Sequence, residues 1–206
     1  MNIILKPLVL IGLILISPII FISLFLVWFE DGSPVIFVQE RLGLSKNKFK
    51  ILKIRTMHKS APNLGTHEVA NAYYLNIGSI IRRIKIDELP QLVNYLKGEL
   101  ELIGPRPGLP SQVKLKEYRD AYNIFNVKPG ITGLAQVLGY DMSNPRALAM
   151  IDSLYIKNRS IQLDVKIFFA TFFNSYRAAL YLSFENEIKQ IIESIGFINY
   201  GRIENK

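Results

Sequence analysis

The sequence of 206 residues contains no cysteine and only two histidines. Without cysteine the chain can form neither a disulfide nor a thiolate metal site. His58 and His67 alone are too few for a typical zinc site. The sequence also has no Walker loop, no dinucleotide-binding glycine pattern and no internal repeat. These absences exclude disulfide-stabilised scaffolds and argue against zinc enzymes and the common nucleotide-binding folds.

Charge is almost absent from the first thirty residues, where only Lys6 and Glu30 are ionisable. From Leu8 to Phe29 the chain has no charged residue, and this run reaches the roughly 20 residues that a helix needs to cross a bilayer. The run is too long for a signal peptide, and no small-x-small cleavage site follows it. We therefore predict that residues 1–30 form a membrane-inserted helix.

Ser17 and Pro18 stand in the middle of this apolar run. Proline removes one backbone hydrogen bond and clashes with the preceding turn, so a bend is expected there. A kinked helix that spans the bilayer and a re-entrant helix that returns to the same side both fit, because hydropathy indicates insertion but not exit.

The formal net charge of +8 lies entirely in residues 31–206, since Lys6 and Glu30 cancel. Basic segments near a membrane stay on the cytoplasmic side and attract anionic head groups. The same charge could serve nucleic acid, but the membrane segment makes this the weaker interpretation. We expect a cytoplasmic domain on the membrane surface.

Hydrophobic periodicity and turn residues predict a mixed α+β fold that is mainly helical, with short strands. An extended segment is predicted at 34–40, and residues 48–57 fit either a strand or a short basic interfacial element. Helices are predicted at 72–83, 87–97, 113–125, 145–155 and 163–182, followed by an amphipathic tail. Gly98 is expected to end the helix 87–97. The aromatic residues of 163–182 recur at helical spacing, which fits a core helix or, alternatively, a helix lying in the membrane interface.

Two adjacent carboxylates, Asp87 and Glu88, stand in the otherwise apolar and basic stretch "IKIDELPQL" at 84–92. Acidic residues are common in the first turn of a helix, and Pro90 fits such a turn. Alternatively, one carboxylate attacks a phosphorus atom while the other holds a cation or a proton. Both readings are open at this point.

Prolines flank an arginine in "GPRPG" at 104–108. The segment is either a rigid turn with a solvated Arg106, or it holds the Arg106 guanidinium in one orientation. In the second case the guanidinium is a fork-shaped hydrogen-bond donor for phosphate. The nearby "PGITG" at 129–133 offers backbone N–H groups with little steric cover.

Taken in order, these pieces form one pattern: the apolar segment broken by Ser17-Pro18, then "VIFVQERLG", "FKILKIRTM", "IDELPQL", "LKGELELIGPRP", "KPGITGLAQV" and "LDVKI". The chain closely resembles the bacterial sugar transferase family, the small monotopic phosphoglycosyl transferases, from residue 1 to about 175. Each motif alone is weak, whereas the combination is specific.

The resemblance implies transfer of a sugar-1-phosphate from a UDP-sugar to undecaprenyl phosphate, with release of UMP. In that family the aspartate of the dyad is the covalent nucleophile and the dyad binds Mg²⁺, roles that fall on Asp87 and Glu88. The Ser17-Pro18 break makes the membrane helix re-entrant. The candidate substrate-binding residues are Arg82, Pro105, Arg106, Pro107, Lys53, Arg55, Gln136 and Asp164.

The implied organisation is a re-entrant membrane helix at 1–30, a catalytic domain with interfacial helices at 31–183 and an amphipathic tail at 184–206. The protein would lie monotopically on the cytoplasmic face of the bacterial inner membrane, contacting its lipids but no nucleic acid, with a homodimer as a further expected assembly.

Tyr140 follows Gly139 where many members have arginine, and Glu101 stands where the small members often have serine. Both departures bear on the sugar rather than on the reaction.

Two other functions fit parts of the sequence. A non-catalytic membrane-anchored module could bind anionic lipid or nucleic acid through its basic surface, but it would need no acidic pair. A membrane-bound phosphohydrolase could use the same dyad and would release free sugar phosphate without a lipid acceptor.

Overall fold

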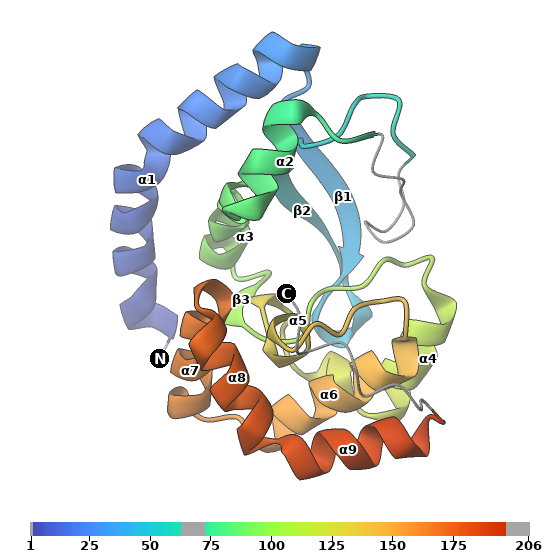
Figure 1. Ribbon diagram of the computed structural model, residues 1–206. Coiled ribbons are helices and arrows are strands. Elements are labelled where there is room, and N and C mark those ends of the chain that lie inside the picture. The colour runs from blue at the N-terminus through green and yellow to red at the C-terminus, as the bar shows by residue number, and fades with distance from the viewer. Residues whose placement is uncertain (1, 63–72, 197–206) are drawn as a thin grey trace. The chain divides into compact units, whose positions relative to one another are not determined.

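The computed structural model describes residues 2–62 and 73–196. His67 and the predicted helix start at residue 72 lie outside these ranges, as does the end of the tail. The helices are α1 (Asn2–Asp31), α2 (Asn76–Arg83), α3 (Gln91–Lys97), α4 (Val113–Ala121), α5 (Leu134–Val137), α6 (Pro145–Lys157), α7 (Ile161–Phe172), α8 (Asn174–Ser183) and α9 (Glu185–Ser194). The strands are β1 (Ile36–Leu42), β2 (Lys48–Ile54), β3 (Glu101–Ile103) and β4 (Gly130–Thr132). The prediction of a mainly helical α+β fold is confirmed (Figure 1).

The chain divides into two compact units. The first contains residues 1–102 and 107–110, and the second contains residues 103–106 and 111–206. The tail helix α9 packs on α6 in the second unit and buries Ile188 and Ile191. The predicted amphipathic tail helix is thus confirmed, and packing joins it to the second unit.

Helix α1 is long and apolar enough to cross a membrane, by length and composition. Pro18 lies inside it, and Figure 1 shows the helix bending near its middle. Pro18 has no N–H to donate to the carbonyl of Ile14, and the hydroxyl of Ser17 donates to this oxygen instead, at 2.7 Å. The serine therefore satisfies a group that would otherwise be unpaired in hydrocarbon.

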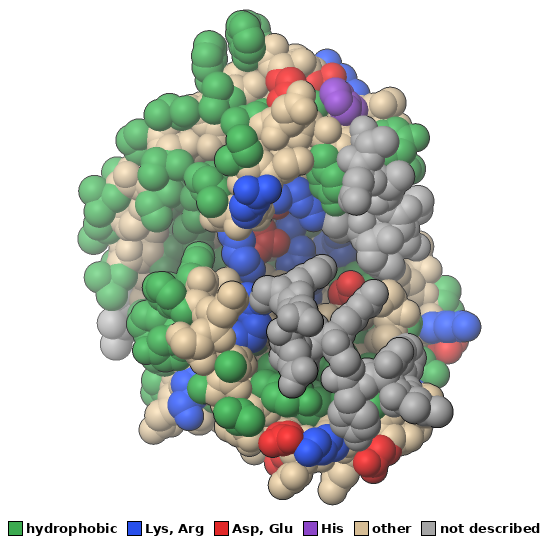
Figure 2. Space-filling model, viewed as in Figure 1, with side chains coloured by type: hydrophobic (Ala, Val, Ile, Leu, Met, Phe, Trp, Pro, Cys, Tyr) green, Lys and Arg blue, Asp and Glu red, His purple; other side chains and the backbone are tan. Residues whose placement is uncertain are grey.

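Large hydrophobic side chains are exposed along α1, as the green surface of this helix in Figure 2 shows. Leu15 is 74% exposed and Phe29 is 78% exposed. Such a continuous apolar surface is unusual in water and marks a contact with lipid or another protein.

The first unit is built on the antiparallel hairpin β1–β2, in which Ile36 pairs with Ile54 and Leu42 with Lys48. Ile54 is buried together with Val27 of α1, Ile81 of α2 and Leu75, which directly precedes α2. The end of the hairpin, the second half of α1 and α2 thus share one core.

Helix α2 begins at Asn76, later than the predicted residue 72. The reason is that the residues just before it pair with the segment after β2: Tyr74 forms a bridge with Met57, and the Leu75 N–H donates to the Thr56 carbonyl at 3.1 Å. A side chain at Gly78 would meet the Thr56 oxygen at 2.3 Å, so only glycine permits this approach.

The predicted helix 87–97 is wrong at its start. Ile86–Glu88 forms a separate 3₁₀ turn, and α3 begins only at Gln91, after Pro90. Gly98 ends α3 with φ 81°, as predicted.

In the second unit, glycines allow two segments to cross. A side chain at Gly130 would meet the backbone nitrogen of Gly104 at 2.1 Å, and one at Gly133 would meet the Gly104 oxygen at 2.2 Å. The Gly104 N–H donates to the Thr132 carbonyl, and the Gly130 N–H donates to the Pro105 carbonyl, each at 2.9 Å. These glycines therefore serve close backbone packing.

The aromatic segment forms two helices, α7 and α8, separated by the extended residue Phe173. Leu163, Ile167 and Ala170 are buried, whereas the aromatic side chains form an exposed cluster of touching rings. This cluster consists of Phe168, Phe169, Phe172, Phe173 and Tyr176. Of the two predicted alternatives, the core helix is wrong for the aromatic residues.

Candidate active site

The acidic pair lies on the 3₁₀ turn Ile86–Glu88 in the first unit. Asp87 is buried, with 6% exposure. The Glu88 carboxylate accepts a hydrogen bond from the ammonium of Lys53 on β2 at 2.8 Å, and both side chains are largely buried. The predicted candidates Lys53 and Glu88 are therefore brought together, although 35 residues separate them in the chain.

The helix-start interpretation of the pair stays open, because Asp87 and Glu88 stand in the first turn of the 3₁₀ helix Ile86–Glu88 rather than in that of α3. Helix α3 has no acidic residue in its first turn, and the pair precedes it on its own short turn. Successive residues of a 3₁₀ turn point about 120° apart. This explains how Asp87 is buried while Glu88 reaches the Lys53 ammonium.

Lys85, directly before the pair, has the left-handed backbone conformation φ 60°, ψ 20°. This conformation costs a non-glycine residue about 1 kcal/mol. It turns the chain between the end of α2 and the 3₁₀ turn, so that the two elements pack against each other. Strained residues of this kind concentrate at functional sites.

Asn94 of α3 holds the helix to the hairpin and was not predicted from the sequence. It is fully buried, its amide nitrogen donates to the Lys50 carbonyl and to Glu99 at 2.8 and 2.7 Å, and its oxygen accepts from Leu52 N at 3.1 Å. A buried asparagine whose amide bonds both a carbonyl and an N–H of β2 fixes α3 against this strand, and with α3 the preceding turn.

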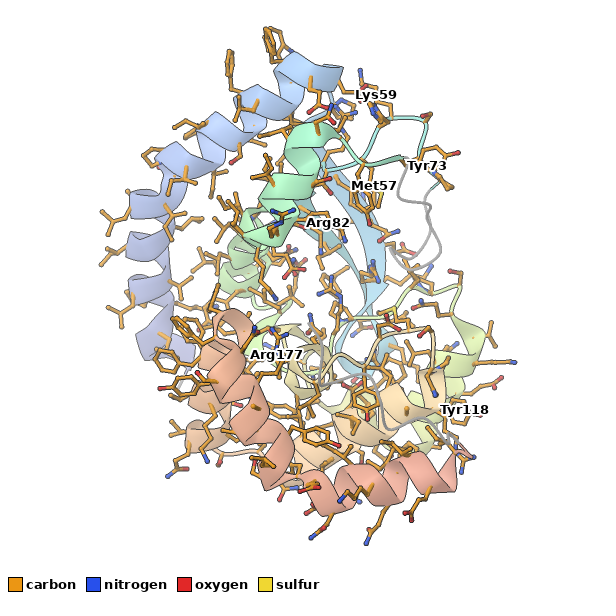
Figure 3. The ribbon with its side chains drawn as sticks, viewed as in Figure 1. Met57, Lys59, Tyr73, Arg82, Tyr118 and Arg177 are labelled. Carbon is orange, nitrogen blue, oxygen red and sulfur yellow. The ribbon has the colours of Figure 1, made fainter. Side chains whose placement is uncertain are left out.

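Arg82, the predicted phosphate-binding arginine, stands in the last turn of α2 (Figure 3). Its guanidinium lies over the ring of Tyr74, 4.9 Å from the ring centre. This cation–π contact holds the guanidinium at one place on the surface of α2.

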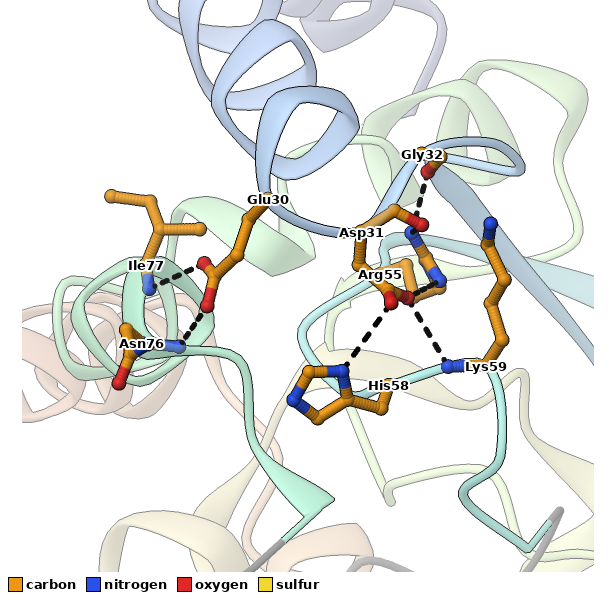
Figure 4. A network of polar contacts seen from close by, with 8 residues as sticks. All are labelled: Glu30, Asp31, Gly32, Arg55, His58, Lys59, Asn76 and Ile77. Atoms are coloured by element: carbon orange, nitrogen blue, oxygen red, sulfur yellow. Dashed lines mark hydrogen bonds and ion pairs between the residues drawn. The ribbon is translucent and has the colours of Figure 1, made fainter.

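Arg55, a second predicted phosphate ligand, is buried in a network at the end of α1 (Figure 4). Its guanidinium donates to the carboxylate and the backbone carbonyl of Asp31 and to the Gly32 carbonyl. Asp31 also accepts from the Lys59 N–H at 3.3 Å and lies 3.4 Å from the His58 ring nitrogen. Arg55 therefore anchors the end of α1, and its contact with phosphate stays a prediction.

The Pro-Arg-Pro segment is held through its flanking residues. Pro105 is buried, and its carbonyl accepts the Gly130 N–H within the second unit. Pro107 is buried within the first unit, where its carbonyl accepts from Arg41 of β1 at 3.1 Å. Arg106 between them remains partly exposed. The prolines and their carbonyl bonds thus fix the backbone around the guanidinium.

Gln136 and Asp164 belong to the second unit. The Gln136 amide nitrogen donates to the Ile131 carbonyl at 3.4 Å, while its buried oxygen meets no donor among the described residues. Asp164 accepts from the hydroxyl of buried Tyr155 at 2.7 Å. Asp164 therefore has a packing role in the first turn of α7, and the substrate contacts of both residues stay predictions.

Tyr140 occupies the position where arginine was expected. Burial, and secondarily the nearby Tyr181, raise the pKa of its hydroxyl above the usual value. Tyr140 therefore stays a neutral phenol in the physiological range. It can donate one hydrogen bond but supplies no positive charge.

Among the described residues there is no group of three or more acidic or histidine side chains that could hold a metal ion, so magnesium binding by Asp87 and Glu88 stays a prediction. Mg²⁺ is commonly bound by one or two carboxylates, with water and substrate phosphates completing its shell. Two adjacent carboxylates, one buried and one paired with an ammonium, fit this donor set.

Comparison with known proteins identifies relatives that match most of the chain. The family described as bacterial sugar transferase matches residues 3–178. The chain is 37% identical over 164 residues to UDP-N-acetylgalactosamine-undecaprenyl-phosphate N-acetylgalactosaminephosphotransferase of Aeromonas hydrophila. It is 40% identical over 151 residues to the sugar transferase EpsL of Bacillus subtilis, and 34% identical over 171 residues to UDP-glucose:undecaprenyl-phosphate glucose-1-phosphate transferase of Caulobacter vibrioides.

These matches differ in how much of each relative they cover. They include 76%, 73% and 76% of this chain, but 39%, 74% and 62% of the Aeromonas, Bacillus and Caulobacter proteins, respectively. The chain thus spans less than two thirds of two of these three relatives.

Proposed function

Because the chain belongs to the bacterial sugar transferase family, we propose that it transfers a sugar-1-phosphate from a UDP-sugar to undecaprenyl phosphate and releases UMP. The observation that carries this proposal is the buried Asp87 beside the Glu88–Lys53 pair. The names of the Aeromonas and Caulobacter relatives support both the lipid acceptor and the UDP-sugar donor.

The reaction runs in two displacements at one phosphorus atom. A carboxylate oxygen of Asp87 attacks the β-phosphorus of the UDP-sugar, the bond from this phosphorus to the bridging oxygen breaks, and UMP leaves with that oxygen. A phosphate oxygen of undecaprenyl phosphate then attacks the same phosphorus. The bond to Asp87 breaks, the carboxylate is restored, and the sugar remains on a lipid diphosphate.

The other candidate residues each have a part in this scheme. Lys53 neutralises Glu88 and keeps positive charge beside the reacting phosphate. Arg82 and Arg106 are fork-shaped donors suited to phosphate oxygens. Mg²⁺, held by Asp87 and Glu88 in this proposal, supplies charge neutralisation for the diphosphate.

Release of UMP tests the proposed reaction. Purified protein should release UMP from at least one of a panel of UDP-sugars, and removal of Mg²⁺ with a chelator should suppress the release. The panel also identifies the sugar. Free sugar phosphate as the product without a lipid acceptor would instead indicate a phosphohydrolase, and no UMP from any donor would contradict the proposal.

Arg106→Lys is expected to lower turnover by about 10- to 100-fold, because lysine keeps the charge but loses the planar fork. Thermal stability should stay near that of the wild type, since the prolines and their carbonyl bonds hold the segment. Arg159→Lys, at an exposed position, is the matched control. An unchanged rate in Arg106→Lys would show that the motif serves only as a rigid turn.

We further propose a monotopic topology, with α1 re-entrant and the rest of the chain on the cytoplasmic face of the bacterial inner membrane. The bend in α1, its exposed apolar surface and the positive charge of residues 31–206 support this topology. The exposed aromatic cluster of α7 and α8 would then contact the lipid interface.

The absence of cysteine makes labelling a clean test of topology. Single cysteines at Asn2 and at exposed Asp120 should both react with a thiol reagent that crosses the membrane and reaches the cytoplasm. Neither should react with an impermeant thiol reagent added from the periplasm. Periplasmic labelling at Asn2 alone would show that the helix spans the membrane.

A further inference from the structure

Helix α2 lacks a capping side chain of its own. Its N-cap residue is Leu75, whose side chain accepts no hydrogen bond. The carboxylate of Glu30 takes this place: its two oxygens accept the N–H groups of Asn76 at 2.7 Å and Ile77 at 3.0 Å (Figure 4). A single residue thus satisfies two of the unpaired donors at the start of α2 and brings negative charge to the positive end of the helix dipole.

The capping residue comes from the end of the membrane helix. Glu30 is the penultimate residue of α1 and precedes Asn76 by 46 positions. The contact is reinforced by the core that Val27 of α1 shares with Leu75 and Ile81. The first turn of α2 is therefore completed only when the end of α1 is seated against it.

The other end of α2 presents Arg82. The ring of Tyr74, two residues before the helix, lies under its guanidinium, and the backbone of Tyr74 is bridged to Met57. Arg82 is consequently placed by two features: the position of α2, which Glu30 stabilises at its first turn, and the Tyr74 ring.

We propose that Glu30 is a positioning residue for Arg82, and that it couples the seating of the membrane helix to the placement of a phosphate-binding guanidinium. This inference rests on the proposed function, in which Arg82 binds a phosphate of one of the two substrates. An isolated helix of eight residues is marginal in water, so an eight-residue α2 depends on such outside support. The membrane-inserted state of α1 then favours the substrate-binding state of the domain.

A merely structural role predicts a different result from a positioning role. If Glu30 only stabilised the fold, its loss would reduce the fraction of active protein, so that kcat would fall while KM stayed constant. If Glu30 positions Arg82, its loss weakens substrate binding while Asp87 remains intact. In that case KM rises and kcat changes little.

The experiment compares Glu30→Ala and Glu30→Gln with the wild type in nanodiscs. For Glu30→Ala we expect KM for the UDP-sugar or for undecaprenyl phosphate to rise about 5- to 10-fold, kcat to change less than about 2-fold, and amides 76–81 to exchange hydrogen at least about 5-fold faster. Glu30→Gln keeps an acceptor oxygen but loses the charge, so its increases in KM and in amide exchange should be smaller than those of Glu30→Ala. Glu187→Ala, which removes an exposed first-turn glutamate of α9, is the matched control and should change neither readout.

A second pair of variants tests the Arg82 end. Tyr74→Phe keeps the ring face and should preserve KM, whereas Tyr74→Leu should raise KM for the same substrate as Glu30→Ala does. Tyr118→Leu, on the surface of α4 (Figure 3), is the control for loss of an exposed tyrosine. These variants also keep the proposal testable if Glu30→Ala does not fold.

The outcomes separate this inference from the proposed function. Failure of the wild type to release UMP contradicts the proposed function, while amide exchange still reports whether Glu30 orders α2. Unchanged exchange in Glu30→Ala, or faster exchange with kcat reduced and KM unchanged, overturns the positioning role even though the enzyme is a transferase.

Discussion

Asp87→Asn should abolish both UMP release and transfer to the lipid, with a fall in turnover of at least about 1,000-fold, or roughly 4 kcal/mol of transition-state stabilisation. Asparagine keeps the shape of the side chain and one acceptor oxygen, but an amide is a poor nucleophile for phosphorus. Although Asp87 is buried, the replacement is nearly isosteric, so folding should be preserved. Asp141→Asn, at an exposed aspartate, is the control.

The two-step scheme makes a second observation decisive. Wild-type protein mixed with a labelled UDP-sugar, without any lipid acceptor, should release about one UMP per active site and retain the labelled phosphosugar, and Asp87→Asn should do neither. Glu88→Gln should also lower turnover severely, because a neutral amide is a weak Mg²⁺ ligand and no base. Release of UMP that strictly requires the lipid acceptor would contradict the covalent intermediate.

The buried ion pair of the second unit should give the largest effect on stability. The guanidinium of Arg119 on α4 donates twice to one carboxylate oxygen of Asp152 on α6, at 3.1 and 2.6 Å, and both side chains are 3% exposed. Arg119→Met leaves the carboxylate buried without its partner, and we expect a loss of about 3–5 kcal/mol in the free energy of unfolding at neutral pH. Thermal or denaturant unfolding of the purified protein measures it.

This loss should depend on pH. Burial raises the pKa of Asp152, and the Arg119 guanidinium opposes the rise, so removing Arg119 should raise that pKa further. A carboxyl group with a higher pKa in the folded than in the unfolded state binds more protons when folded, and stability then falls as pH increases between the two values. Arg119→Met should therefore be closer to the wild type at pH 5 than at pH 7.5.

A double replacement controls for the loss of charge itself. Arg119→Met combined with Asp152→Leu removes both charges and should recover most of the stability, because an apolar pair of similar volume is often neutral or stabilising. A double variant as unstable as the single one would show that α4 and α6 need the ion pair for more than charge balance.

Local patterns were sufficient for much of this protein. The uncharged run from Leu8 to Phe29 predicted α1, because the hydrophobicity of a long segment needs no tertiary partner to be recognised. Gly98 predicted the end of α3, because only glycine readily adopts the left-handed conformation required there. The order of the motifs identified the family, since their combination is far more specific than any one of them.

Tertiary structure decided what the candidate residues contact. The sequence could not show that Lys53 pairs with Glu88, that Arg55 binds Asp31 at the end of α1, or that Glu30 caps α2, because each contact joins residues more than 20 positions apart. The sequence also placed the acidic pair in α3, since its residues suit a helix start. The turn at Lys85 and the packing of the hairpin moved the pair onto its own turn, with Asp87 buried. Residue types thus determined which chemistry is available, whereas long-range packing determined what each candidate side chain contacts, because burial and pairing depend on neighbours that the local sequence does not contain.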